Sequence, residues 1–252
     1  MTDNNSDKIL IAKAKDVIRL SEKHFCTKSS DFLTPAEAAV LKKENLFSPD
    51  SKQKFFGGYD DAERVMLVSF PDYYEDFDPE EVVSILKITG RNISALGHRD
   101  FLGSLMGLGI KREKLGDIVI SKDGVYVFAA ADIACYIKDN LTKVANCGIK
   151  INITKKSDEF VCERETEEIR GTVQSLRLDA VLALGLRISR AKALQFIESE
   201  RVSLNWQTAQ SGAMNLKEGD LFSVRGFGRF KLFEIGGTTK KGRTAITVLK
   251  YI

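Results

Sequence analysis

Residues 177–205, RLDAVLALGLRISRAKALQFIESERVSLN, carry the pattern that decides the fold of the C-terminal part of the chain. Apolar residues recur there at helical spacing, at Leu178, Val181, Leu182 and Leu186. This spacing predicts a short amphipathic helix over 178–186. Ser189 then stands where the N-cap of a second helix belongs, and that helix is expected over 190–199. Alternating apolar residues from Val202 onward predict a strand, so the stretch indicates two helices leading into a sheet.

The start of the second helix carries a charge of the wrong sign. Arg190 and Lys192 lie in its first turn, where positive side chains oppose the helix dipole at a cost of about 0.3 kcal/mol or more. A bound anion would reverse this cost, because free N–H groups, the dipole and both cations would favour the same phosphate. The alternative is a mildly frustrated helix end in water.

The basic character of this region extends beyond one helix. Residues 172–252 contain thirteen Lys and Arg against six Asp and Glu, a balance of 13 − 6 = +7. The rest of the chain has 25 basic and 29 acidic residues, a balance of −4, so the overall +3 conceals the asymmetry. A basic terminal part on a slightly acidic body is the charge distribution expected of a nucleic-acid binder.

The strands that follow favour the same interpretation. One strand is expected over 221–234, with apolar residues at even positions and a mixed face at odd positions: Arg225, Phe227, Arg229, Lys231 and Phe233. Cations interleaved with aromatics suit a phosphate backbone and splayed bases. A bulge at Gly226 or Gly228 would break the alternation. Lys240, Lys241 and Arg243 cluster in a loop before a last strand at 245–251.

The rest of the chain predicts an α+β protein. Residues 1–75 are expected to form a small helical domain, with helices over 7–25 and 35–43, an aromatic turn at 55–61 and a closing strand at 64–70. Thr34 and Glu37 form a capping box at the second helix.

Residues 76–155 have the order β-α-β-β-α-β of a ferredoxin-like or RRM-like domain. A hairpin at Lys122-Asp123 joins its second and third strands, and a helix is expected over 131–144. Tyr126 and Phe128 share one face of the third strand, as RNA-reading aromatics would, but we expect them in the core because the full aromatic signature is missing. A charged connector, 156–174, leads to the last domain, 175–252.

Composition excludes several classes. No stretch approaches the roughly 20 apolar residues of a membrane helix, and the polar start is no secretory signal, so a cytoplasmic protein with no membrane partner is expected. The four cysteines form no CxxC pair, so neither a zinc site nor a disulfide framework is indicated. No metal and no cofactor is expected.

The C-terminal residues resemble the S4 RNA-binding domain. The resemblance rests on Arg177-Leu178-Asp179, Ser189-Arg190-Ala191-Lys192-Ala193, Ile197, Val202, Asn205 and Gly219-Asp220. Glu200 departs from it, because the family usually has Gly in that turn.

Upstream motifs extend the resemblance over nearly the whole chain. Gly57-Gly58-Tyr59, the run 97–103, Gly116-Asp117-Ile118 and the run 223–230 are similar to the bacterial YlmH family. That resemblance implies a ribosome-associated protein in quality control of stalled translation, which binds ribosomal RNA of a large subunit still carrying peptidyl-tRNA.

Enzyme-like signals are weak. Arg177-Leu178-Asp179 also resembles the catalytic motif of pseudouridine synthases, but only 73 residues follow Asp179, too few for a catalytic domain. His98-Arg99-Asp100 are sequence neighbours that do not share a helix face. Residues 237–244 nearly spell a P-loop but lack its strand-before, helix-after context.

We therefore expect a monomeric, non-enzymatic protein that binds ribosomal RNA, with tRNA as a further partner. Its expected RNA-binding residues are Arg177, Arg187, Ser189, Arg190, Lys192, Asn205, Arg225, Arg229, Lys231, Lys240, Lys241 and Arg243. Two alternatives stay open. One is an RNA-modifying enzyme that gathers His98, Asp100 and Asp117 in a pocket, and the other is a scaffold for the cell-division machinery.

Overall fold

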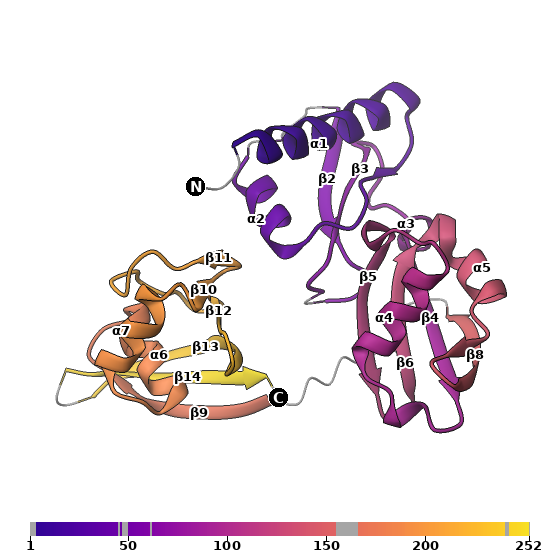
Figure 1. Ribbon diagram of the computed structural model, residues 1–252. Coiled ribbons are helices and arrows are strands. Elements are labelled where there is room, and N and C mark those ends of the chain that lie inside the picture. Colours follow the sequence, from indigo (N-terminus) through magenta and orange to yellow (C-terminus); the bar gives the residue numbers. More distant parts are fainter. Residues whose placement is uncertain are drawn as a thin grey trace. The chain divides into compact units, whose positions relative to one another are not determined.

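The structure is a computed structural model that describes most of the 252-residue chain: residues 4–44, 46, 50–60, 62–154, 166–239 and 242–251. The chain divides into two compact units, Met1–Cys162 and Glu163–Ile252. Each unit has its own helices, sheet and core (Figure 1). Among the described residues, no helix is both long and apolar enough to span a bilayer.

The first unit begins with the two predicted helices, α1 (Asn4–His24) and α2 (Pro35–Lys43). The capping box of α2 is confirmed. The hydroxyl of Thr34 accepts a hydrogen bond from the Glu37 N–H at 3.3 Å, and the Glu37 carboxylate accepts one from the Thr34 N–H at 2.7 Å.

This N-terminal part also contains a sheet that the sequence pattern shows only in part. Three strands pair antiparallel in the order β1-β3-β2: β1 (Lys28–Ser29), β2 (Ser51–Phe56) and β3 (Met66–Pro71). β3 is the predicted strand, and α1 packs on the sheet (Figure 1). The predicted turn at 55–61 is wrong at its start, because Phe55 and Phe56 end β2 and pack against different clusters on its two faces.

The central part has the predicted β-α-β-β-α-β order. Its elements are α3 (Pro79–Val82), β4 (Val83–Gly90), the 3₁₀ turn η1 (Ile93–Ala95), α4 (His98–Gly107), η2 (Arg112–Lys114), β5 (Leu115–Ser121), β6 (Gly124–Ala130), α5 (Ala131–Asn140), β7 (Lys143–Val144) and β8 (Cys147–Thr154). The sheet order β5-β6-β4-β8-β7 is antiparallel throughout, which is the ferredoxin-like arrangement with an added edge strand. α5 ends four residues earlier than predicted, before β7.

The two faces of the central sheet are both covered over β6. Val125 and Val127 pack with α4 and α5, while Tyr126 and Phe128 pack with Phe32 and other residues of the N-terminal part. Tyr126 and Phe128 are only 3% and 0% exposed, which confirms that they belong to the core. The aromatics that an RRM would offer to RNA are therefore buried.

A carboxylate of β5 fixes the N-terminal part to this sheet. Asp117 accepts hydrogen bonds from the Tyr59 hydroxyl at 2.8 Å and from the backbone N–H groups of Glu63 at 2.7 Å and Arg64 at 3.1 Å. Gly58, next to Tyr59, has φ +98°, and a Cβ there would lie 2.5 Å from the Phe128 ring. The predicted boundary at residue 75 thus falls inside one compact unit whose sheets share a core.

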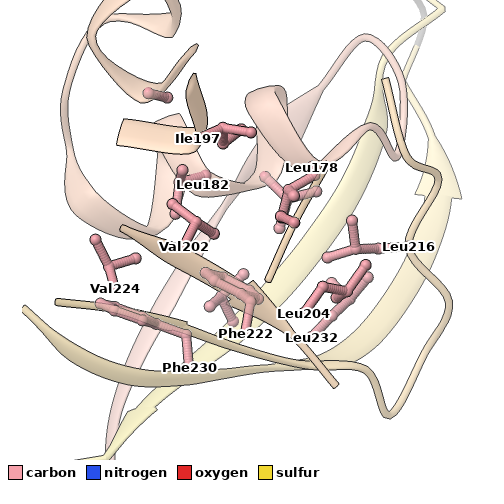
Figure 2. Close-up of a cluster of buried hydrophobic side chains, with 14 of the residues drawn as sticks. Leu178, Leu182, Ile197, Val202, Leu204, Leu216, Phe222, Val224, Phe230 and Leu232 are labelled. Atoms are coloured by element: carbon pink, nitrogen blue, oxygen red, sulfur yellow. The ribbon is translucent and has the colours of Figure 1, made fainter. Parts of the chain in front are cut away.

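The second unit packs two helices on a six-stranded sheet. Its elements are β9 (Thr166–Val173), α6 (Leu178–Leu186), α7 (Arg190–Glu198), β10 (Val202–Leu204), β11 (Gln207–Thr208), β12 (Leu221–Val224), β13 (Gly228–Thr238) and β14 (Thr244–Tyr251). The strand order is β11-β10-β12-β13-β14-β9. In Figure 2, side chains of the helices, such as Leu178 and Leu182, meet Phe222 and Phe230 of the strands.

The single strand predicted over 221–234 is wrong. Gly226 and Gly228 have φ values of +89° and +100°, so the chain turns at 225–227 and forms the β12–β13 hairpin. The even residues Phe222 and Phe230 nevertheless pair across the hairpin and are buried, as predicted. The connector predicted at 156–174 lies partly outside the described residues, and its end forms the edge strand β9.

Candidate RNA-binding surface

The helix pair of the second unit is held by local caps. The Ser189 hydroxyl accepts a hydrogen bond from the Lys192 N–H at 3.3 Å, which confirms Ser189 as the N-cap of α7. At the start of α6, the N–H groups of Leu178 and Asp179 donate to the carbonyls of Met214 and Gly212 at 2.8 and 3.1 Å. These N–H groups in the first turn of α6 therefore already have acceptors within the protein.

Two predicted arginines converge on one buried carboxylate. Asp179 is 1% exposed and accepts hydrogen bonds from Arg177 and from Arg190, whose Nη2 lies 3.0 Å from both carboxylate oxygens. The side chains of Arg177 and Arg190 are 39% and 46% exposed. Burial works to raise the pKa of Asp179, but the hydrogen bonds from the two arginines outweigh it and hold the pKa below its ordinary value.

The contact with Asp179 changes the net charge of this cluster and leaves some N–H donors of the two arginines free of it. One carboxylate neutralises one of the two positive charges, so the cluster has a net charge of +1. Each arginine has five N–H donors in a planar fork, and the contacts to Asp179 use only part of them. The buried anion therefore orients two half-exposed guanidinium groups next to the start of α7.

A second group of charges surrounds the end of α6. Arg187 is the residue that ends this helix, in the left-handed conformation with φ 55° and ψ 43°. It donates to Glu167 of β9 at 2.9 Å, and Lys250 of β14 lies 3.7 Å from the same carboxylate. Two cations again share one anion.

Cations and aromatics also alternate around the β12–β13 hairpin. The guanidinium of Arg229 lies 4.4 Å from the ring centroid of Trp206, and that of Arg201 lies 4.6 Å from that of Phe196. Arg201 also donates to the carbonyl of Arg225 at 2.9 Å. The hairpin tip is thereby tied to the helix pair.

The remaining predicted residues occupy different positions. Asn205 is structural, because its side chain donates to Asp220 at 2.9 Å and accepts from the Leu221 N–H at 3.0 Å. Arg243 donates to the carbonyl of Thr172 at 2.6 Å. Among the described residues, Lys192, Arg225 and Lys231 have no ion-pair partner. Lys240 and Lys241 lie outside the described residues.

The predicted residues do not form one compact patch. Arg229 is near the start of β13 and Arg243 follows its far end, which a rise of about 3.3 Å per residue places about 30 Å away. The sequence prediction missed Arg201 and Lys250, which join the surface through contacts with Phe196 and Glu167. Arg201 directly precedes β10 and Lys250 lies near the end of β14.

The residues of the alternative enzyme site have separate structural roles. Asp100 accepts from the Gly97 N–H at 2.8 Å and closes the start of α4, while Asp117 holds the N-terminal part. His98 is exposed in the first turn of α4. The described residues contain no group of three or more His, Cys, Asp or Glu arranged to hold a metal ion.

The second unit, with its capped helix pair, its sheet and its cationic surface, defines an S4-domain RNA-binding protein; the S4 family model matches residues 176–222. A second model, "Putative RNA-binding domain in YlmH", matches residues 75–158. The chain belongs to the YlmH family. It is 35% identical over 243 residues to "Ribosome-associated protein quality control protein P2" of Bacillus subtilis (strain 168), an alignment that covers 96% of this chain and 94% of that protein.

A solved structure shares the fold. "Cell division protein ylmH from Streptococcus pneumoniae" superimposes with a TM-score of 0.53 at 17% sequence identity, covering 64% of this chain and 98% of that one.

Proposed function

We propose that this protein binds ribosomal RNA through its S4 unit and acts, without catalysis, in quality control of stalled translation. The B. subtilis relative is named as a ribosome-associated quality control protein, which supports the ribosome as the partner. The expected target is the large subunit that still carries peptidyl-tRNA, bound by a monomer in the cytoplasm.

The observation that carries the proposal is the pair of arginines around Asp179. Arg177 and Arg190 are oriented by a buried anion and remain 39% and 46% exposed. Lys192 lies in the same first turn of α7, whose dipole favours a phosphate. Oriented guanidinium groups suit the bidentate recognition of phosphate oxygens.

The second group of cations supports an extended contact. Arg187 and Lys250 lie at the other end of α6, and Arg225 is exposed at the hairpin tip. A surface of separated cationic groups suits a folded RNA, whose phosphates lie along a backbone of many nucleotides. Neither the enzyme nor the scaffold alternative has a comparable observation in its favour.

Sedimentation with separated ribosomal subunits tests the proposal. The protein should pellet with large subunits, more strongly when they carry peptidyl-tRNA, and much less with small subunits. About six phosphate contacts predict a loss of affinity on the order of a thousandfold between roughly 50 and 200 mM salt. Equal sedimentation with both subunits would contradict the choice of partner, and salt-insensitive sedimentation would contradict the mode of binding.

A further inference from the structure

A small hollow of about 120 Å³ opens on the S4 unit between the end of α6 and the tip of the β12–β13 hairpin. Two phenylalanines line it: Phe230, which is buried, and Phe227 at the hairpin tip, which is 41% exposed. Arg187 and Lys250 also line it and share Glu167, so its charged groups sum to +1. It is smaller than the roughly 300–1,000 Å³ of drug-sized ligand sites.

We propose that this hollow receives one unstacked RNA base, which stacks on Phe227 while its flanking phosphate contacts Arg187 and Lys250. The inference rests on the proposed function and adds to it the kind of nucleotide that is recognised. Every base has a π-face, so an exposed aromatic ring beside cations suits any unpaired nucleotide of a loop or strand.

The ring of Phe227 is held in place before any ligand binds. Gly226 and Gly228, both with positive φ, flank it, and its N–H donates to the carbonyl of Val224 at 2.9 Å. The ring also lies 5.4 Å from that of Phe196, centroid to centroid. An exposed but fixed aromatic ring loses little freedom when a base stacks on it.

Two residues that line the hollow are of a type that is unusual for their backbone position. Gly185 lies inside α6, where Ala would be more stable, and a Cβ there would meet its nearest neighbours at 3.6 Å, an ordinary contact distance. Arg187 has φ 55°, a conformation in which glycine is normally found. A methyl group would fit at Gly185 without a clash, so close packing does not require glycine there, and Arg187 brings a positive charge to the hollow in spite of its unfavourable conformation.

The test measures the affinity of the protein for two 12-nucleotide single strands by fluorescence anisotropy. One strand is oligoadenylate, and the other is an abasic strand with the same number of phosphates. The wild type should bind oligoadenylate about five- to 150-fold more tightly, the equivalent of about 1–3 kcal/mol for one stacked base. Phe227→Ala should remove most of this preference and leave abasic binding unchanged. Phe233→Ala is the matched control, because Phe233 is 48% exposed on β13 and does not line the hollow.

A second variant shows whether binding is lost because the hollow is filled or because the protein unfolds. Gly185→Ala should raise or maintain the melting temperature and still reduce the preference for oligoadenylate at least threefold. Equal effects of Phe227→Ala and Phe233→Ala, or a wild type without preference between the strands, would overturn the base site. If that wild type still binds ribosomal RNA, the proposed function survives; if it binds no RNA at all, both fail.

Discussion

Arg190 and Asp179 form the central contact of the S4 unit: one guanidinium nitrogen lies 3.0 Å from both oxygens of a carboxylate that is 1% exposed. The contact joins the first turns of α6 and α7. A buried carboxylate is expensive unless it is paired, and Arg177 completes the pairing. The same contact therefore stabilises the helix pair and orients the proposed phosphate-binding groups.

Removing the carboxylate should affect both properties. We expect Asp179→Ala to lower the free energy of unfolding by about 2 kcal/mol, because hydrogen bonds to charged groups disappear while the half-exposed arginines can rehydrate. Urea denaturation followed by circular dichroism measures this. The matched control is Asp132→Ala, because Asp132 is a helix carboxylate of the other unit, in the first turn of α5. Equal effects would show that Asp179 is not an anchor.

The free energy of unfolding of the S4 unit should depend on pH because Asp179 titrates. Its folded pKa is below the ordinary value of 3.8, so its contribution is complete above about pH 4 to 5 and is lost as the pH falls through the folded pKa. The free energies of unfolding of the wild type and of Asp179→Asn should therefore differ most near neutral pH, and the difference should shrink as the pH falls below about 4. A constant difference across this range would contradict the assigned shift.

Removal of positive charges from the S4 unit should make RNA binding less dependent on salt. The effect should grow with the number of phosphates that the protein no longer neutralises. The double variant Lys192→Gln with Arg225→Gln should flatten the slope of log affinity against log salt by about 1.4 to 1.8, at about 0.7 to 0.9 for each phosphate. Lys111→Gln with Lys138→Gln removes the same charge from exposed positions of the first unit. A slope that changes equally in both pairs would indicate a general charge effect without direct contact.

The first unit has its own anchor in Asp117. Asp117→Ala leaves the Tyr59 hydroxyl and two backbone N–H groups without their acceptor, and we expect a loss of about 2 kcal/mol in the free energy of unfolding. Tyr59→Phe removes only the first of these bonds and should cost about 1 kcal/mol. Differential scanning calorimetry would show whether the transition of the S4 unit stays in place, as we expect from two compact units. An unchanged stability of Asp117→Ala would mean that the N-terminal part is held by its apolar core alone.

Local chemistry explains which parts of the fold were predictable. Thr34 with Glu37, Ser189, and the Lys122-Asp123 turn act through neighbours within a few residues, and the structure places each as predicted. The strand β2 was missed because Phe55 and Phe56 pack on partners far along the chain. The turn at 225–227 depends on how Gly226 and Gly228 use their freedom, and the alternation of apolar residues does not determine this.

The candidate site was harder to predict than the fold. The composition located the cations, but their pairing with Asp179 and Glu167 depends on tertiary contacts that no spacing rule shows. Asp179 lies in the first turn of α6. That this acid would also bind Arg190, eleven residues away, follows only from the fold.

The central claim, that ribosomal RNA binds the cationic surface of the S4 unit, is tested most directly by crosslinking the protein to purified large subunits and mapping the joined residues. We predict crosslinks from ribosomal RNA to the start of α7, the end of α6 and the β12–β13 hairpin, all of them removed by a salt concentration of about 500 mM during binding. Crosslinks confined to ribosomal proteins, or to the first unit alone, would contradict it.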